Sequence, residues 1–384
     1  MEQLGFLQEL KEISKPATGY NIFKETSDGH DLVSIGGLDV SVQKSFTGYH
    51  AMIMHGSELH ALLLSKVPRH KIHFGKRVLS ISQEDDDSVM IRTSDGAGYQ
   101  GEILVGSDGT YSAVRQSLYK NLTKEGVLPS SDAEDLKVSH LSYCGTTDPI
   151  DSAIAPCIAD EFSHCDVIIG HNKPETSEAF RNTEWSSEAS KSMDESWNAF
   201  KVPLGPNGGY LTLGDLIKAT PDEQISKIVL EEKLFITWYN RRTVLLGDAC
   251  HKMLPNAGKA IVNAMLDAVV LANELYEIID DASNKNILSA FKEYYKVRYP
   301  YAKTDFEISQ RTARLIAGQS KTEVMVRKAV YSFGVTLLKP KANPKIMAYR
   351  PQASFLPKIG NHGEGCLDPQ KESKRYQQMM AAAI

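Results

Sequence analysis

A short segment near position 245 combines a strand pattern, an acidic turn and a long helical pattern. Residues 243 to 246 form an apolar run of the length expected for a buried parallel strand, and Gly247 and Asp248 follow it directly. After a turn that contains Pro255, an apolar helical spacing begins at Gly258. Ligands of open α/β sheets bind where parallel strands end, so this order predicts a ligand site. Taken alone, it also fits ordinary α/β architecture.

The helix predicted after Gly258 carries a narrow stripe of small side chains. Alanine recurs at every fourth position, which places these residues on one helix face: Ala260, Ala264, Ala268 and Ala272. Larger apolar residues widen that face: Ile261, Met265, Leu271, Leu275 and Ile278. We therefore expect most of this helix to be buried against the sheet, with another group packed closely on the alanines.

A second segment upstream follows the same order of features. Residues 103 to 105 predict a strand, a glycine-rich turn places Asp108 after it, and residues 112 to 118 have helical spacing with Arg115 in the first turn. Asp108 and Asp248 are far apart in the sequence. They can nevertheless converge at one edge of a parallel sheet, where both would contact one extended cofactor.

An antiparallel meander is predicted just before that turn. Apolar runs over residues 78 to 82 and 89 to 93 precede the strand at 103 to 105. A GxGxxG string lies in this meander, at Gly96, Gly98 and Gly101. Because a strand rather than a helix follows it, we interpret these glycines as a hairpin loop and not as a dinucleotide-binding turn.

The two acidic segments carry a family resemblance. GSDGTYSAVR (106 to 115) and GDACHKMLPNAG (247 to 258) resemble the second and third signatures of the FAD-dependent aromatic hydroxylases. That family includes salicylate and p-hydroxybenzoate hydroxylases, and the fungal FAD-dependent monooxygenases look most similar. The resemblance implies FAD as cofactor, NADH or NADPH as electron donor and molecular oxygen as co-substrate. It also implies hydroxylation of a small aromatic substrate through a flavin hydroperoxide.

The resemblance further implies which residues contact FAD. Asp248 would bond the ribityl chain, Pro255 would lie beside the isoalloxazine ring, and the helix after Gly258 would point at the flavin. The implied cofactor-binding residues are Asp108, Arg115, Gly247, Asp248, Pro255, Gly258, Lys259, Ala260 and Asn263. No catalytic base is assigned, because a structural role is favoured for each candidate: His251, Tyr143 and Tyr239.

The chain departs from the family pattern in three places. It lacks the N-terminal strand, GxGxxG turn and helix, and begins instead with a helical spacing over residues 4 to 13 that Pro16 ends. No arginine stands near positions 55 and 56, where the family uses one to hold the FAD phosphates. Positions 258 to 260 read Gly-Lys-Ala where the family has Gly-Gln-Gly, which adds a methyl group close to the flavin.

We therefore predict a mixed α/β fold, with an N-terminally truncated Rossmann-like FAD/NAD(P)-binding domain and an inserted, sheet-containing substrate domain. The predicted parts are the FAD-binding domain (1–134 and 236–320), the substrate domain (135–235) and a C-terminal extension (321–384). Two alternatives stay open. The chain could be an impaired pseudoenzyme or incomplete gene product that binds FAD weakly or not at all, or a flavoprotein of another type, such as a dehydrogenase or halogenase.

Composition narrows the partners. The 384 residues are 42% hydrophobic and 24% charged with a net charge of -5, and no basic run is interleaved with aromatic residues, so a nucleic-acid surface is not expected. The five cysteines lack the spacing of a disulfide framework or zinc site, and the histidines lack an HExxH pattern. We expect no bound metal, a cytoplasmic location, and Cys250 as a small buried apolar residue.

The two ends of the chain show no membrane-spanning or targeting pattern. The acidic start disfavours a signal or transit peptide. Residues 329 to 338 are the most apolar C-terminal segment, but a bilayer span needs about 20 such residues. We expect them to form an amphipathic helix that completes the fold or, as an alternative, to contact a membrane or partner peripherally. Residues 349 to 357 predict a loop packed on the body. The oligomeric state stays open.

Overall fold

The computed structural model describes residues 1–25, 31–82, 87–146, 164–170, 198–203, 210–317, 322, 325–326 and 347–382. Its α-helices are α1 (Leu7–Glu12), α2 (Val42–Thr47), α3 (Gly56–Ser65), α4 (Ala113–Lys124), α5 (Ser130–Ala133), α7 (Leu213–Lys218), α8 (Ala260–Glu277), α9 (Asn284–Ala317) and α13 (Lys374–Ala382). Short 3-10 turns are η1 (Arg69–Lys71), η4 (Asp222–Gln224), η5 (Gly247–Ala249) and η6 (Pro255–Ala257).

The strands alternate with these helices and confirm the predicted mixed α/β class. They are β1 (Lys15–Ala17), β2 (Gly19–Glu25), β3 (Leu32–Asp39), β4 (Ala51–Ile53), β5 (Val78–Ser82), β6 (Val89–Thr93), β7 (Gly98–Gly101), β8 (Leu104–Gly106), β9 (Lys137–Thr146), β10 (His164–Gly170), β11 (Lys201–Pro203), β12 (Tyr210–Thr212), β13 (Ile225–Leu234), β14 (Tyr239–Asn240), β15 (Thr243–Leu245) and β16 (His251–Lys252).

One small sheet brings the two acidic turns together. Its strand order is β14, β15, β8, and β15 runs parallel to β8 with Leu245 opposite Gly106. Both strands were predicted from their apolar runs, and Val244 and Leu245 are fully buried, as expected for a strand covered on both faces. Because parallel strands end at the same sheet edge, the turns that hold Asp108 and Asp248 leave from one edge.

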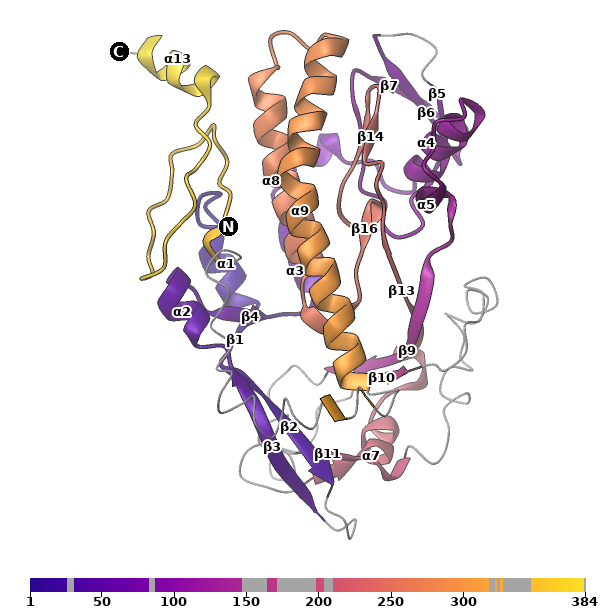
Figure 1. Cartoon of the computed structure of the whole chain (residues 1–384), viewed down its shortest axis with the longest axis vertical. Coiled ribbons are helices and arrows are strands. Elements are labelled where there is room, and N and C mark those ends of the chain that lie inside the picture. Colours follow the sequence, from indigo (N-terminus) through magenta and orange to yellow (C-terminus); the bar gives the residue numbers. More distant parts are fainter. Residues whose placement is uncertain are drawn as a thin grey trace.

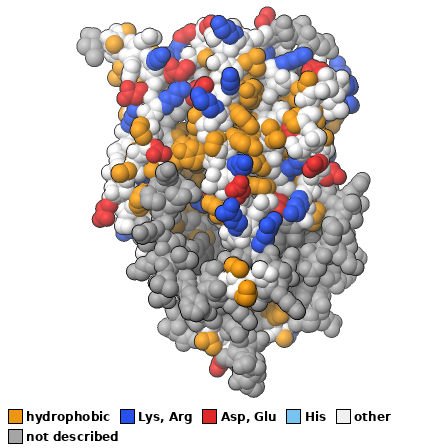
Figure 2. All heavy atoms as spheres, in the orientation of Figure 1, with side chains coloured by type: hydrophobic (Ala, Val, Ile, Leu, Met, Phe, Trp, Pro, Cys, Tyr) orange, Lys and Arg blue, Asp and Glu red, His pale blue; other side chains and the backbone are white. Residues whose placement is uncertain are grey.

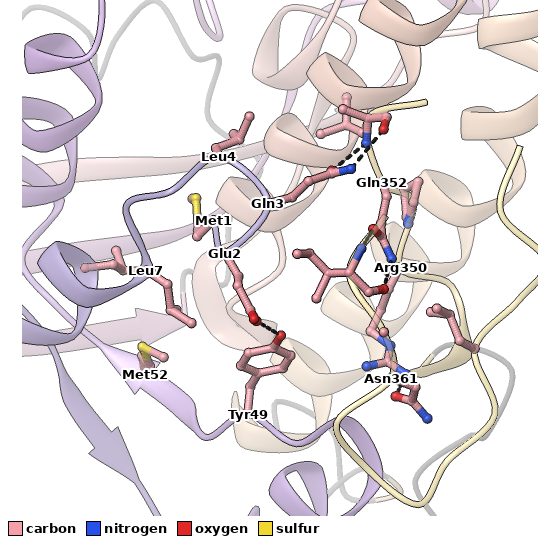
Figure 3. Close-up of a pocket in the computed structure, with 17 residues that line it drawn as sticks. Met1, Glu2, Gln3, Leu4, Leu7, Tyr49, Met52, Arg350, Gln352 and Asn361 are labelled. Carbon is pink, nitrogen blue, oxygen red and sulfur yellow. Dashed lines mark hydrogen bonds between the residues drawn. The ribbon is translucent and has the colours of Figure 1, made fainter. Parts of the chain in front are cut away.

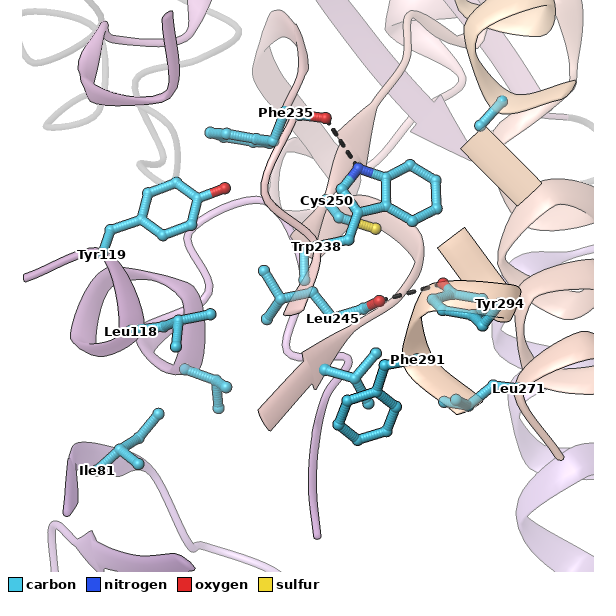
Figure 4. Packing of buried hydrophobic residues seen from close by; sticks show 14 of the residues in the cluster. Ile81, Leu118, Tyr119, Phe235, Trp238, Leu245, Cys250, Leu271, Phe291 and Tyr294 are labelled. Atoms are coloured by element: carbon cyan, nitrogen blue, oxygen red, sulfur yellow. Dashed lines mark hydrogen bonds between the residues drawn. The ribbon is translucent and has the colours of Figure 1, made fainter. Parts of the chain in front are cut away.

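Helices α8 and α9 run side by side through the upper and middle parts of the molecule, next to this sheet (Figure 1). The core between α9 and β15 is aromatic: Phe291 and Tyr294 are fully buried, and the Tyr294 hydroxyl donates to the Leu245 carbonyl at 3.1 Å (Figure 4). Trp238 lies in the same cluster with none of its surface exposed. The strand that carries the Gly247–Asp248 turn is therefore clamped by α9.

The alanine stripe of α8 is packed closely at one position. A Cβ atom built on Gly247 would lie 3.1 Å from the Cβ of Ala264, so the turn after β15 rests on the stripe there. The expected burial of Ile261 is wrong, since 54% of it is exposed. Ile261 lies on the opposite side of α8 from Asn263 and Asp267, which face α9 and the turn.

The meander before Asp108 has two of its three predicted strands, but its third strand is β7, because the strand predicted at 103 to 105 is β8 and pairs with β15 in the parallel sheet. β5 and β6 begin and end at the predicted residues, and β6 pairs antiparallel with β7. Of the GxGxxG glycines, Gly96 lies in the turn between β6 and β7, where the Thr93 N–H donates to the Ala97 carbonyl at 2.9 Å, whereas Gly98 and Gly101 are the first and last residues of β7. The string therefore belongs to a hairpin, as predicted, but only Gly96 is in its loop. The N-terminal helix spans only Leu7–Glu12, shorter than predicted, and Pro16 lies within β1.

A second, antiparallel sheet follows in the order β10, β9, β13, β16. It lies below and beside the helices, and β13 leads from it back to the small parallel sheet (Figure 1). Most of its residues fall within the predicted substrate domain, although β16 belongs to the turn after β15. Through the pairing of β13 with β16, the antiparallel sheet is therefore connected directly to the turn that follows β15.

The C-terminal segment, residues 347–382, lies along α8. The Asn273 side chain donates to the Gln352 carbonyl at 2.9 Å and accepts from the Ser354 N–H at 2.8 Å. The predicted loop at 349 to 357 is confirmed, whereas residues 329 to 338 lie outside the described residues. Hydrophobic and basic side chains mix on the face over α8 and α9 (Figure 2). In the described part of the chain, no helix is both long and apolar enough to span a bilayer.

Candidate cofactor site

The turns after β8 and β15 are tied to each other. The Leu246 N–H donates to the Gly106 carbonyl at 3.0 Å, continuing the parallel ladder to the sheet edge. Beyond the strands, Arg115 of α4 reaches across and donates from Nη1 to the Ala249 carbonyl at 2.9 Å. The predicted convergence of the two segments is therefore present in the structure.

Asp108 caps helix α4. Its carboxylate accepts from the N–H groups of Ala113 at 2.7 Å and Val114 at 3.1 Å, and from the Ser112 hydroxyl. A carboxylate at a helix N-terminus is favoured by the unpaired N–H groups there. Asp108 thus shapes the turn beside the candidate site, and its direct contact with FAD stays a prediction.

Ser112 completes this cap, because its hydroxyl accepts from the Arg115 N–H at 2.9 Å. We expect Ser112→Ala to lower the free energy of unfolding by about 1 kcal/mol, the usual cost of losing a capping hydroxyl. Urea unfolding measures the change. Ser117→Ala, in the same helix and only partly buried, is the matched control. Equal losses in both variants would contradict the assignment.

Arg115 is a buried bridge between the two turns. Only 5% of it is exposed, and its Nη2 donates to the Thr110 carbonyl at 2.7 Å while the guanidinium stacks 4.2 Å from the Phe235 ring centre. With Nη1 on Ala249, the side chain has bonds to both acidic turns. Arg115 therefore holds the two turns together, and its predicted contact with FAD stays a prediction.

Asp248 lies in the turn after β15 and is partly exposed. Its side chain is 28% exposed and pairs with Lys252 at 2.8 Å. Gly247 before it adopts φ +61, and Gly258 adopts φ +60, a left-handed conformation that favours glycine. Pro255 and Gly258 are exposed, and a Cβ built on Gly258 would meet nothing within 4 Å. The predicted residues at this edge therefore border open space.

Helix α8 begins beside that space with free N–H groups. The side chain of its N-cap residue Lys259 makes no capping hydrogen bond, and its first turn holds no acidic residue. Lys259 and Ala260 are partly buried. The positive end of an 18-residue helix is consequently available for an electron-rich group, which is what a flavin carbonyl offers. This fits the predicted cofactor.

Asn263 belongs to a buried polar cluster that the sequence did not reveal. Its Oδ1 accepts from Arg298 Nη2 of α9 at 2.7 Å, and its Nδ2 donates to Asp305 at 2.9 Å. Arg298 Nε also donates to Asp267 at 2.8 Å. Asn263, Asp267 and Arg298 are fully buried. Asn263 therefore faces α9, and a direct contact with FAD stays a prediction.

A sequence signal for this cluster exists in the spacing of α9. The helix buries one face, made of Phe291, Tyr294, Arg298, Ala302, Asp305 and Ser309. These positions follow one another at helical intervals of three and four. Two charged residues and a serine on the buried face of a helix indicate that the neighbouring element supplies polar partners for them.

Cys250, His251 and Asp267 lie close enough to suggest a metal site, with one ligand atom from each within 4.8 Å of the others. The charges argue against that assignment. Asp267 already pairs with Arg298 at 2.8 Å and with His251 Nε2 at 2.6 Å, so a cation would face a guanidinium. Burial raises the pKa of the Cys250 thiol well above its ordinary value, which keeps it neutral. Cys250 is fully buried, as predicted.

A pocket of 340 Å³ lies elsewhere, between the N-terminal segment and the C-terminal segment (Figure 3). Leu7, Met52 and other apolar residues form its walls, and Arg350 and the Tyr49–Glu2 hydrogen bond supply its polar groups. None of the predicted cofactor residues is among the described residues that line it. It is separate from the edge formed by β8 and β15.

Comparison with curated proteins gives fungal relatives. The chain is 27% identical to the FAD-dependent monooxygenase ausM of Aspergillus calidoustus, over 96% of this chain and 80% of the relative. It is 28% identical to the FAD-dependent monooxygenase ptmM of Penicillium ochrochloron, over 70% of this chain and 67% of the relative. The shared designation, with the family match below, confirms the predicted enzyme class, an FAD-dependent monooxygenase.

Solved structures share the fold. Klebsiella pneumoniae HpxO, crystallised with FAD and uric acid, superposes with a TM-score of 0.61 at 18% identity, covering 90% of this chain and 83% of that one. A salicylate hydroxylase substrate complex gives 0.59 at 16% identity, covering 86% and 83%. The sequence profile described as "FAD binding domain" matches residues 1–304. The chain therefore belongs to the FAD-binding domain family, as its two acidic segments predicted.

Proposed function

We propose that this FAD-dependent monooxygenase takes electrons from NADH or NADPH and transfers one atom of molecular oxygen to a small, electron-rich aromatic substrate. The observation that carries the FAD site is the parallel pairing of β8 with β15, which brings both acidic turns to one edge beside the uncapped start of α8. The chemistry that FAD supplies when bound is hydride acceptance and oxygen activation.

The residues of this edge divide into those that would contact FAD and those that support them. Asp248, Pro255, Gly258 and Lys259 border the open space and would bind the ribityl chain and the flavin ring. The first-turn N–H groups of α8 would stabilise negative charge on the flavin. Asp108 and Arg115 would support the site from the side of β8 and α4, where their hydrogen bonds fix the shape of the turn after β8.

The antiparallel sheet would form the substrate side of the site. The sheet connects to the turn after β15 through β13 and β16, so a substrate bound against the sheet would lie near the flavin. Its role would be to orient the aromatic ring and exclude water. His251 is fully buried against Asp267, and Tyr143 is 5% exposed, so neither is assigned as the catalytic base.

FAD titration of the purified chain tests the cofactor step. We expect FAD to raise the melting temperature, because a ligand that binds only the folded state stabilises it. Oxidation of NADH or NADPH with salicylate and p-hydroxybenzoate as probes, under ¹⁸O₂, tests the reaction. Label in a hydroxylated product supports monooxygenation. No thermal shift with FAD would favour the alternative of an impaired chain, and FAD binding with turnover but no label would favour another flavoprotein activity.

Asp248→Ala tests the predicted ribityl contact. We expect FAD affinity to fall roughly tenfold, the effect of losing one hydrogen bond to a charged group. Stability without FAD should change little, because the exposed pair with Lys252 contributes at most about 1 kcal/mol. Fluorescence quenching of FAD gives the affinity, and Lys252→Ala is the control for loss of the ion pair. Equal affinities of wild type and Asp248→Ala would remove Asp248 from the site.

A further inference from the structure

Asp267 is buried behind the candidate site, on the second turn of α8. We infer that Asp267 is a positioning residue, which holds the Gly247–Asp248 turn and the start of α8 in the geometry that binds FAD. The inference rests on the proposed FAD site and extends it to α9. Asp267 has no exposed surface, so it acts through the residues it bonds and not by touching the cofactor.

The Asp267 carboxylate collects three donors from three places in the chain. Its Oδ2 accepts from the Gly247 N–H at 2.9 Å and lies 2.6 Å from His251 Nε2. Its Oδ1 accepts from Arg298 Nε at 2.8 Å. Burial alone would raise the pKa of Asp267, but the His251 hydrogen bond and the Arg298 charge lower it below its ordinary value. The carboxylate is therefore ionised and holds all three donors.

A second link ties the start of α8 to α9. Arg298 Nη2 donates to Asn263 Oδ1 at 2.7 Å, and Asn263 Nδ2 donates to the Lys259 carbonyl at 3.0 Å and to Asp305 at 2.9 Å. Lys259 is the residue from which the free N–H groups of α8 begin. The same guanidinium therefore fixes both the turn, through Asp267, and the helix start, through Asn263.

This arrangement bears on binding because Gly247 directly precedes Asp248. Gly247 has a left-handed conformation and sits against Ala264, so its N–H direction determines where the turn leaves the strand. A turn held by a buried ionic bond is ordered before the ligand arrives, which lowers the entropy cost of binding. Small displacements of a binding group have large effects on a bound reactant.

The test compares Asp267→Asn with Glu274→Gln. Asparagine keeps the size but offers one acceptor oxygen, which the charged Arg298 takes, so the amide NH₂ faces the Gly247 N–H. Glu274 is a matched control in the same helix. It is 6% exposed and pairs with Lys371 at 2.6 Å, but it faces the C-terminal segment. Both variants lose one buried charge, and only the first touches the turn.

Hydrogen exchange of the chain without FAD is the first readout. We expect the Gly247 amide to exchange roughly tenfold faster in Asp267→Asn, relative to amides of the β5–β6 hairpin, and to be unchanged in Glu274→Gln. If Gly247 responds equally in both variants, or only in step with the whole chain, the inference is overturned. Should Asp267→Asn fail to fold, Arg298→Lys replaces it. That variant keeps a positive charge, but we expect the amides of residues 263 to 266 to exchange faster than in the wild type.

FAD affinity and the visible circular dichroism of bound flavin are the second readout. We expect Asp267→Asn to weaken FAD binding roughly tenfold and to change the flavin spectrum, since the binding turn shifts. Glu274→Gln should match the wild type in both. Unchanged affinity and spectrum in Asp267→Asn overturn the inference while the proposed function stands. If the wild type binds no FAD, the proposed function fails, and hydrogen exchange alone decides whether Asp267 holds the turn.

Discussion

Replacing Arg298 with methionine is expected to lower the free energy of unfolding by about 3–5 kcal/mol, the cost of breaking a buried ion pair from one side. Methionine fills most of the volume but leaves Asp267 ionised in a site with no exposed surface. Asn263 also loses the donor to its Oδ1. The effect is therefore chiefly the energy of an uncompensated buried charge, with a lost hydrogen bond added.

The size of this effect should depend on pH. In the wild type the pKa of Asp267 is below its ordinary value, so its stabilising contribution is present above that value and is lost as pH falls through the lowered pKa. Without Arg298, one of the groups that lower the pKa of Asp267 is lost while its burial remains, so the carboxyl takes up a proton at a higher pH in the variant than in the wild type. The penalty then fades as pH falls and the carboxyl takes up a proton. We expect a smaller difference between variant and wild type at pH 5 than at pH 7.5.

Urea unfolding at both pH values measures this prediction. Arg311→Met is the control, because Arg311 is in the same helix and pairs with Glu307 on the surface, where 79% of its side chain is exposed. That exposed pair should contribute almost nothing. A loss in Arg298→Met no larger than in Arg311→Met would show that the buried pair does not stabilise the fold. A penalty that grows toward pH 5 would contradict the charge assignment.

The strands of the site could be predicted because their signals are local. The apolar run at 243 to 246 became β15 (Thr243–Leu245), and the run at 103 to 105 became β8 (Leu104–Gly106), each within one residue. The acidic turn that follows each strand also lies where the sequence indicated, since a strand end and a glycine turn are adjacent in the chain. The meeting of the two turns followed from one topological rule, that parallel strands end at the same sheet edge and that ligands bind there.

The contacts of the predicted site residues could not be read in the same way. Asn263 and Arg115 were assigned to the cofactor from their motif positions, yet the structure buries both and engages their polar atoms with other protein groups. Those partners lie far along the chain: Ala249 for Arg115, and Arg298 and Asp305 for Asn263. Which side of a helix meets which neighbour depends on packing, and the charged sequence of α9 resembles a solvent-facing helix.

Trp238→Ala is expected to cost about 3–5 kcal/mol, as for other fully buried aromatic residues truncated in a core. Trp238 has no exposed surface, and its indole N–H donates to the Phe235 carbonyl at 2.8 Å. Its ring centre lies 5.2 Å from that of His251, and three tyrosine rings of α9 surround it: Tyr294, Tyr295 and Tyr299. Alanine leaves a cavity where α9 meets the turn that carries His251.

Trp238→Phe separates the two contributions of this side chain. Phenylalanine keeps much of the ring packing but leaves the Phe235 carbonyl without its donor, so its cost should be about 1–2 kcal/mol. Thermal and urea unfolding of both variants give the comparison. Because His251 bonds Asp267, the cavity in Trp238→Ala should also speed exchange of the Gly247 amide, and Trp238→Phe should not. Equal losses of stability in the two variants would show that the hydrogen bond, and not the packed ring, holds α9 against the turn.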